Sequence, residues 1–128
     1  MSSHSIPIPE GYQQVMPYLI IRNAAEFLTF MKKVFQAEEV ATYMRDEKLI
    51  MHGELKIGNS VIMFADSTSQ IAPQNAGLYV IVENADETYK AALAQGAVSV
   101  MEPSDKEYGR SSGVTDPFGN TWWITSAL

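Results

Sequence analysis

Two stretches of the chain share one order of hydrophobic and polar positions. Runs of branched and aromatic residues at 15–21 and 78–82 are typical of strands. An asparagine that can cap a helix follows each run, Asn23 in one and Asn84 in the other, and a glutamate stands three residues later in the capping-box position. We therefore expect a helix after each strand.

The spacing of apolar residues supports both helices. In the first segment they recur at intervals of three, four and one, which gives a single hydrophobic stripe. Its members are Phe27, Phe30, Met31, Val34 and Phe35. The stripe of the second segment is weaker and consists of Tyr89, Ala92 and Leu93. Gly96 follows it and is expected to end that helix.

Three further strands are predicted after each helix. They cover about 38–45, 49–57 and 60–65 in the first stretch, and about 97–103, 112–115 and 121–126 in the second. Turn-forming residues separate them, among them Gly58-Asn59 and the Asp-Pro-Phe-Gly segment at 116–119. The order βαβββ is therefore expected twice.

The two stretches also align with each other at a shift of 61 residues. The identical pairs include Tyr18 and Tyr79, Asn23 and Asn84, Ala24 and Ala85, Glu26 and Glu87, Gly58 and Gly119, and Asn59 and Asn120. Matches near both ends at one offset indicate a duplication, the alternative being accidental matching of common strand and turn residues.

This repeat predicts an α+β fold. Two βαβββ modules, at about 13–66 and 76–128, would form a curved mixed sheet around a cup, joined edge to edge with their helices outside. Residues 13–128 would then be a single domain, and residues 1–12 an extended N-terminal tail.

The composition excludes several kinds of functional site and disfavours some partners. The chain has 128 residues, 46% of them hydrophobic, and no cysteine, which excludes disulfides, thiolate metal sites and cysteine nucleophiles. Its opening residues lack the features of a secretory signal, and no apolar run approaches about 18 residues. The net charge of −6 disfavours nucleic acid and anionic membranes as partners. We expect a soluble, cytoplasmic protein.

The segment Asp-Pro-Phe-Gly-Asn at 116–120 lies before the last predicted strand. Together with the Asn-Ala pairs that begin at Asn23 and Asn84, and with Gly96-Ala97, it resembles the vicinal oxygen chelate superfamily of glyoxalases, extradiol dioxygenases, fosfomycin-resistance enzymes and bleomycin-binding proteins. The resemblance covers roughly 13–126. The stretches 16–19, 51–55 and 108–110 are similar to a glyoxalase-like branch often labelled as phosphonate-metabolism-related.

The resemblance implies metal ligands on the first and last strand of each module. In this chain those positions fall on Met16, Gly77, Ile62 and Trp123. None of these side chains supplies the oxygen or imidazole donors that Mg²⁺, Mn²⁺ or Fe²⁺ requires. We therefore expect no metal at the usual place and no other cofactor.

His52 and Glu54 are the candidate catalytic residues. They are two apart on a predicted strand and so share one face. The imidazole could act as a general base, oriented by the carboxylate. The alternative is a hydrated outer face without function. A metal site here would need a third donor such as Glu39 or Asp66.

An aromatic and apolar lining is expected for the cup. Trp122 and Trp123 alternate across the last strand, and the family's register turns Trp123 inward. The other candidate ligand-binding residues are Met16, Tyr18, Ile62, Phe64, Tyr79, Tyr108 and Arg110. Tyr108 and Arg110 belong to a polar connection that lies at the mouth of the cup in similar proteins. Arg110 could clamp a carboxylate or phosphonate, or pair with a surface acid instead.

These residues favour a metal-independent protein that binds a small aromatic or cationic organic molecule. The alternative is a metal-dependent lyase, isomerase or dioxygenase of glyoxalase type, with a rearranged site that includes His52 and Glu54. A third reading is a partner-binding module with a filled core. Each module has a sheet edge that invites pairing, so we also expect a homodimer, with or without exchange of modules.

Overall fold

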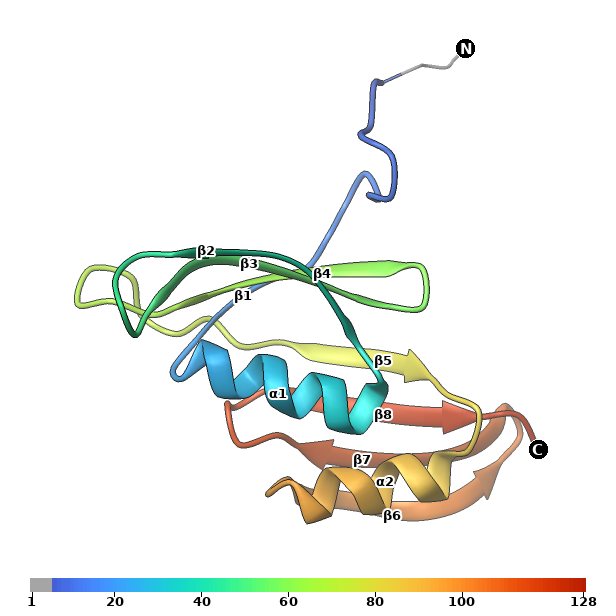
Figure 1. Cartoon of the computed structure of the whole chain (residues 1–128). Helices are drawn as coiled ribbons and strands as arrows, with labels where there is room; N and C mark the ends of the chain where they lie inside the picture. Colours follow the sequence, from blue (N-terminus) through green and yellow to red (C-terminus); the bar gives the residue numbers. More distant parts are fainter. Residues whose placement is uncertain (1–5) are drawn as a thin grey trace.

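The computed structural model describes residues 6–128, so the first part of the expected tail, 1–5, lies outside the described residues. Two modules follow each other along the chain (Figure 1). The first contains β1 (Tyr18–Ile21), α1 (Ala24–Phe35), β2 (Glu38–Met44), β3 (Ile50–Ile57) and β4 (Ser60–Asp66). The second contains β5 (Gly77–Ile81), α2 (Ala85–Ala94), β6 (Val98–Lys106), β7 (Gly109–Thr115) and β8 (Thr121–Ser126). The predicted order βαβββ is thus present twice.

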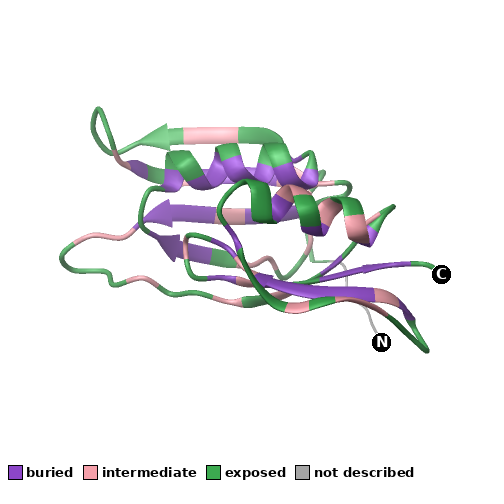
Figure 2. Cartoon of the chain, turned by 90° about the horizontal axis from the view of Figure 1, so that it is seen from below, coloured by how far each residue is buried: buried purple, intermediate pink, exposed green. Residues whose placement is uncertain are grey.

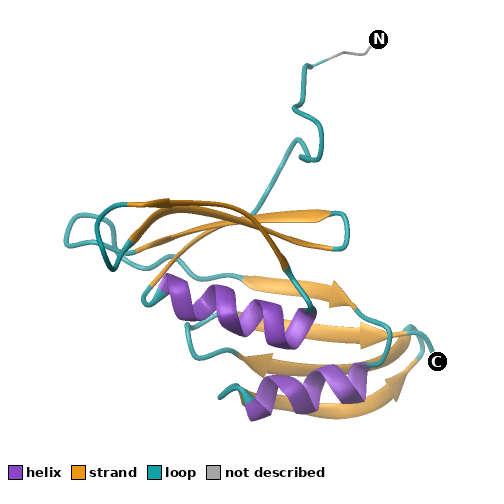
Figure 3. Ribbon diagram, viewed as in Figure 1, coloured by secondary structure: helices purple, strands orange, loops and turns teal. Residues whose placement is uncertain are grey.

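Each module has its own four-stranded mixed sheet. Sheet A has the order β1-β4-β3-β2 and sheet B the order β5-β8-β7-β6. In both, the first and last strands of the module are parallel and the other neighbours are antiparallel (Figure 3). The predicted α+β fold class is confirmed. The described strands form no ladder between the sheets, so the edge-to-edge joint suggested by the sequence is not made within one chain.

A single hydrophobic core joins the modules. It contains the apolar stripe predicted for α1 and the inner residues of both sheets. Across the boundary, the Phe35 ring lies 4.7 Å from that of Trp122, and the Phe27 ring lies 5.5 Å from that of Phe118. Buried residues follow the inner sides of the helices, while the connecting loops are exposed (Figure 2). Because both inner faces turn toward this core, the other face of each sheet turns outward.

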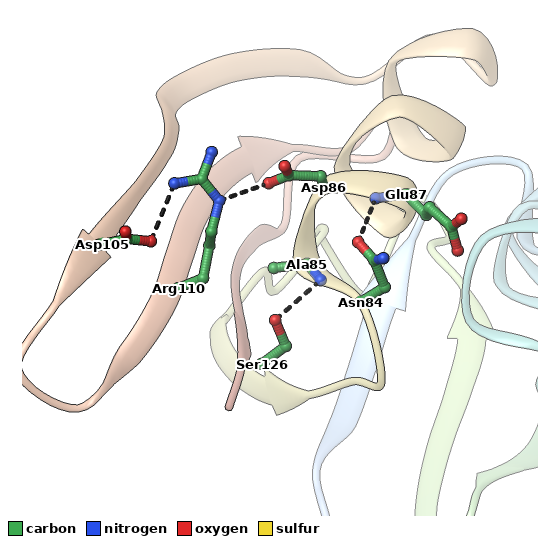
Figure 4. Close-up of polar contacts among 7 residues, drawn as sticks. All are labelled: Asn84, Ala85, Asp86, Glu87, Asp105, Arg110 and Ser126. Carbon is green, nitrogen blue, oxygen red and sulfur yellow. Dashed lines mark hydrogen bonds and ion pairs between the residues drawn. The ribbon is translucent and has the colours of Figure 1, made fainter. Parts of the chain in front are cut away.

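The two helices begin differently. Asn84 caps α2 as predicted, since its side-chain oxygen accepts a hydrogen bond from the Glu87 backbone N–H at 3.1 Å (Figure 4). Asn23 does not cap α1: it has a left-handed backbone with φ 61° and makes no side-chain cap bond. Asp66 accepts the Ala24 N–H at 2.9 Å instead, from the end of β4. The prediction for Asn23 was therefore wrong.

Strand β7 is longer than predicted. It begins at Gly109 rather than at 112, and Arg110 pairs with Asp105 across the hairpin with β6. The segment expected to be a polar connection is thus mostly strand. Serine and glycine have low strand propensity, and here cross-strand pairing overrides it. One such contact is the 2.9 Å hydrogen bond between the Ser111 and Thr125 hydroxyls.

The turn before β8 fixes both tryptophans. The buried Asp116 carboxylate accepts the Trp122 indole N–H at 2.8 Å and the backbone N–H groups of Phe118 and Asn120 at 2.8 and 2.9 Å. These bonds hold Trp122 in the core. Because neighbouring residues of a strand point to opposite faces, Trp123 then faces outward.

No helix in the described part of the chain has the length and apolar character needed to cross a membrane.

Candidate functional site

A hydrogen-bonded network of four side chains lies on the outer face of sheet A. The Tyr18 hydroxyl is 2.9 Å from His52 Nδ1, and His52 Nε2 is 2.8 Å from Glu54 Oε2. The Tyr12 hydroxyl donates to Glu54 Oε1 at 2.5 Å. Tyr43 stacks on the His52 ring at 6.1 Å. The structure therefore brings together the predicted pair His52 and Glu54 and one predicted lining residue, Tyr18.

Strand alternation and register place these groups. His52 and Glu54 are on the side of β3 that faces away from α1, whereas Leu55 lies in the core. Tyr18 of β1 is opposite Met63 of β4, which is opposite Glu54. The side chains of Tyr18, Met63 and Glu54 thus form one row across neighbouring strands.

Glu54 is the charged centre of the network. Only 7% of its surface is exposed, and both carboxylate oxygens have a partner. The hydrogen bond from Tyr12 holds the pKa of Glu54 below its usual value; His52 adds to this effect and burial opposes it. The same bond raises the pKa of Tyr12. Glu54 is therefore ionised at neutral pH and can only accept hydrogen bonds.

The N-terminal segment is pinned to this face. Gln13 follows Tyr12, and its side-chain amide bonds both backbone groups of Val61 in β4, donating to O and accepting from N–H at 3.2 Å each. Figure 1 shows the chain leaving sheet A on the side away from α1. Beneath the segment is a hollow of about 340 Å³ lined by Tyr12, Met16 and Met63, among others.

The outer face of sheet B is aromatic and apolar. Tyr79 and Trp123 are directly opposite on β5 and β8, and they are 59% and 37% exposed. The Trp123 ring lies across Gly113 of β7, where an added Cβ would come within 2.6 Å of a ring atom. Ile81 and Val98 extend the surface. The two tryptophans thus lie on opposite faces of β8, as the alternation predicted, but within one chain Trp123 faces outward and not inward as expected.

Two predicted lining residues are not on an outer face. Ile62 and Phe64 belong to the core under α1, where they are 4% and 0% exposed. The residue of β4 that corresponds to Trp123 is Met63, since β1 pairs Tyr18 with Met63 as β5 pairs Tyr79 with Trp123. The first module has one more residue between the turn glycine and this position, so counting from Gly58 was wrong by one.

Arg110 and Tyr108 are also apart from the network. The Arg110 guanidinium donates to Asp86 of α2 at 2.9 Å and to Asp105 of β6 at 3.0 Å (Figure 4). The Asp86 carboxylate, with help from Asp105, raises the pKa of Arg110. The alternative weighed for Arg110, an ion pair with surface acids, is the one present. Tyr108 lies in the turn between β6 and β7 and is exposed.

The usual metal positions do not fit a metal ion. With Met63 in place of Ile62, they hold Met16, Gly77, Met63 and Trp123, none of which is a ligand for Mg²⁺, Mn²⁺ or Fe²⁺. Neither proposed third donor joins His52 and Glu54: Glu39 binds Lys32 and Thr42 on the surface, and Asp66 holds the start of α1. Within residues 6–128, no three His, Cys, Asp or Glu side chains are grouped so as to hold an ion.

A large cleft lies elsewhere, between the modules. It encloses about 1010 Å³ and is bordered by the end of α1, the β3–β4 turn, β5 and the first half of α2. Only Ile62 and Tyr79 of the predicted residues line it. The cleft is thus separate from the network around Glu54.

Sequence reasoning missed Tyr12, Tyr43 and Met63. Tyr43 is opposite His52 in the β2–β3 hairpin, so a careful register of that hairpin could have found it. Tyr12 gave no local signal, because its partner is 42 residues away.

Comparisons with known proteins give one consistent family. Residues 11–124 match the family described as the Glyoxalase/Bleomycin resistance protein/Dioxygenase superfamily. An uncharacterized protein of Mycobacterium tuberculosis (strain H37Rv) is 28% identical over 118 residues, which cover 83% of this chain and 69% of that protein.

Solved structures share the fold. A putative 3-demethylubiquinone-9 3-methyltransferase, PhnB protein, from Bacillus cereus has a TM-score of 0.74 and 22% identity over 90% of this chain and 100% of that one. TioX from Micromonospora sp. ML1 has a TM-score of 0.70 and 20% identity over 91% and 97%. The fosfomycin resistance protein FosX from Mesorhizobium loti has a TM-score of 0.67 and 16% identity over 91% and 92%.

Proposed function

Because this chain belongs to the Glyoxalase/Bleomycin resistance protein/Dioxygenase superfamily, we propose that it binds a small aromatic or cationic organic molecule in an apolar cup. Binding would not depend on a metal at the superfamily's usual positions. The observation that carries the proposal is the exposed Trp123 ring, which lies across Gly113 of β7, with Tyr79 opposite Trp123 on β5. Such a surface suits stacking on a planar ligand.

The residues at the usual metal positions support this choice. Met16 and Met63 offer flexible, polarisable side chains that adapt to an apolar ligand. The net charge of −6 attracts a cationic ligand, and an ionised Glu54 lies on the outer face of sheet A.

The cup itself requires a second copy of the chain in this proposal. Within one chain, the core separates the outer face of sheet A from that of sheet B, so Tyr18 and Trp123 do not meet. In a homodimer, sheet A of one copy would face sheet B of its partner. The exposed apolar residues Tyr79, Ile81 and Val98 of sheet B are typical of such an interface.

An open strand edge also favours self-association. The outer edge of β1 is bridged within the chain, because Ile20 and Gln74 exchange two backbone hydrogen bonds at 3.2 and 2.8 Å. Among the described residues, β5 pairs only with β8, so its outer edge is open to a partner. Light scattering at micromolar concentration should therefore give the mass of a dimer, and a monomer would contradict this part of the proposal.

A thermal-shift screen tests ligand binding. The panel would contain planar aromatic compounds, both neutral and cationic, at near-millimolar concentration. A ligand that binds the native state must raise the unfolding temperature. We expect the shift to be lost in Trp123→Ala and reduced in Gly113→Ala, which displaces the ring. It should be kept in Tyr108→Ala, a more exposed aromatic residue outside the face. No stabilisation by any compound would contradict the proposal.

Mixed dimers test whether two copies build the cup. Tyr18→Ala and Trp123→Ala subunits each fail to bind as homodimers if both residues contact the ligand. In a mixed dimer with shared cups, one cup carries both changes and the other carries neither. Half of the sites of each mixed dimer should therefore return, which is about a quarter of all sites after random exchange in a one-to-one mixture. If each cup were formed by one chain, no site would return.

A metal-dependent lyase, isomerase or dioxygenase is the second candidate function. The bond between His52 and Glu54 favours it. Metal analysis of protein purified without chelator separates the two functions. Near-stoichiometric divalent metal that is lost in His52→Ala would favour the enzyme over the binding protein.

A further inference from the structure

The charge of Glu54 determines which group donates in each hydrogen bond of the network on sheet A. The ionised carboxylate accepts from His52, so in the neutral form of the imidazole the proton is on Nε2. Nδ1 then has a free lone pair, and the Tyr18 hydroxyl 2.9 Å away donates to it. The lone pairs of the Tyr18 oxygen are left without a donor from this network, on a side chain that is 45% exposed.

We propose that Tyr18, His52 and Glu54 form a proton relay in which Tyr18 is the catalytic base on the outer face of sheet A. The fitting substrate class is a small organic molecule whose C–H or O–H is acidified by a neighbouring carbonyl group. The relay goes beyond ligand binding, and rests on the proposed function only in that the substrate would occupy the same cup.

Proton transfer from the substrate to His52 through Tyr18 needs no further reactant. The substrate proton bonds to the Tyr18 oxygen as the hydroxyl proton of Tyr18 passes to His52 Nδ1. The electron pair of the broken bond stays on the substrate as an enolate or related anion. The positive charge that forms on His52 is next to the Glu54 carboxylate, at 2.8 Å. This division of roles is that of other triads, in which an acid orients and stabilises a histidine that accepts a proton from a hydroxyl group.

The surroundings hold the relay in place. The His52 ring is flanked by Tyr18, 5.4 Å away at 40°, and by Tyr43, 6.1 Å away at 29°. Tyr12 occupies the second oxygen of Glu54, so this carboxylate cannot turn away from His52 without losing a hydrogen bond. The acid is buried and the hydroxyl is exposed, which is the order needed for reaction with a molecule from solvent.

A purely structural role is the competing explanation. In that case, the network only attaches the N-terminal segment to sheet A through Tyr12. The two explanations differ in the reactivity of Tyr18. A tyrosine with a histidine base should attack an electrophile faster than other exposed tyrosines, whereas a structural hydrogen bond gives it no advantage.

The test is acetylation of the full-length protein by N-acetylimidazole at neutral pH, with the rate at each tyrosine followed by peptide mass spectrometry. The Tyr18 oxygen bonds to the acetyl carbon, the carbon–nitrogen bond of the reagent breaks, and the hydroxyl proton moves to His52 Nδ1. The departing imidazole takes a proton from water. Within one chain, Tyr79 and Tyr108 are both more exposed than Tyr18. Tyr108, outside the proposed interface, is the control for reactivity, and Tyr79 controls for shielding by the partner.

We expect Tyr18 to react about 10²-fold faster than the controls, the lower end of general-base assistance. His52→Gln should bring its rate down to theirs, and Glu54→Gln should lower it markedly. Tyr12→Phe frees one oxygen of Glu54 but leaves the bond between His52 and Glu54, so it should lower the rate less than His52→Gln does. In unmodified protein, nitrogen NMR of His52 should show the proton on Nε2.

A Tyr18 rate no higher than those of Tyr79 and Tyr108 would overturn the relay, and so would a fast rate that is unchanged in His52→Gln. The comparison of tyrosines within the unmodified protein needs no variant, so a variant that fails to fold does not prevent the test. It also needs no ligand. A failed ligand screen with a reactive Tyr18, or the reverse, therefore shows which of the two proposals is wrong.

Discussion

At the scale of single residues, Glu54 has the most constrained environment. It is a nearly buried carboxylate whose two oxygens accept hydrogen bonds from different side chains, Tyr12 and His52. Burial alone would favour the neutral acid, but the two donors favour the anion. The pKa of Glu54 is therefore lowered on folding, which links the stability of the protein to pH.

The sign of this linkage gives a prediction for Glu54→Gln. A lowered pKa in the folded state means that the stabilisation by Glu54 is fully present above its unfolded pKa, about 4.3. It is lost as pH falls from that value through the lower folded pKa. The difference in unfolding free energy between the native protein and Glu54→Gln should thus be largest near neutral pH and shrink below about pH 4.

Urea unfolding at a series of pH values measures this difference. Glu47→Gln, in the exposed turn between β2 and β3, controls for the loss of one negative charge. A gap for Glu54→Gln that stays constant down to pH 3, or that equals the gap for Glu47→Gln, would show that the network does not stabilise the ionised carboxylate.

At the scale of elements, the start of each helix is tied to the end of the last strand in its module. Asp66 at the end of β4 accepts the N–H groups of Ala24 and Ile50, at 2.9 and 2.7 Å. Ser126 at the end of β8 accepts the Ala85 N–H at 3.0 Å (Figure 4). In both modules, a side chain at the end of the last strand thus attaches the helix to the sheet by a hydrogen bond. The acceptor is a carboxylate in the first module and a hydroxyl in the second.

Because Asp66 and not Asn23 binds the start of α1, we expect substitutions of these two residues to change stability unequally. Asp66→Ala leaves two backbone N–H groups without their acceptor and should cost about 2–4 kcal/mol of unfolding free energy. Asn23→Gly should change stability by less than about 0.5 kcal/mol, because the side chain caps nothing and the positive φ suits glycine. Urea unfolding of both variants measures this. Equal losses would mean that Asn23 contributes to the cap.

At the scale of the whole molecule, the two modules share one core. The Phe35 ring at the end of α1 contacts Trp122 of β8, so the first helix packs on both sheets. A module alone would expose the residues of this contact. We therefore expect the modules to unfold together.

Phe35→Ala tests the shared core. Removing this ring should cost about 3–5 kcal/mol, as for other large-to-small changes in a core. Calorimetry of the native protein should give equal calorimetric and van't Hoff enthalpies, the mark of one cooperative transition. Two separate transitions, or a loss confined to one module by amide hydrogen exchange, would show that the modules are independent.

Local patterns were sufficient for part of this architecture. The repeat of βαβββ, the helix cap at Asn84 and the shared face of His52 and Glu54 depend on residues that are close in the sequence. The failures came from long-range geometry. Asn23 lost its capping role to a residue on another strand, and Ile62 was displaced by a one-residue difference in the turn before β4.

Arg110 shows a different limit. Its sequence neighbourhood is compatible with both a ligand clamp and a surface ion pair. The choice is made by Asp86, which belongs to α2 and comes near only because sheet and helix pack together. The role of Arg110 could therefore not be assigned from the sequence, because its partners were not known.

Trp122 and Trp123 are the two tryptophans of the chain and are adjacent in sequence, yet they occupy opposite environments. Their fluorescence therefore has two components with different sensitivities. A soluble quencher such as acrylamide should reach Trp123 in the native protein but Trp122 only after unfolding. The molecule thus carries one optical reporter for its outer surface and another for its interior, side by side on a single strand.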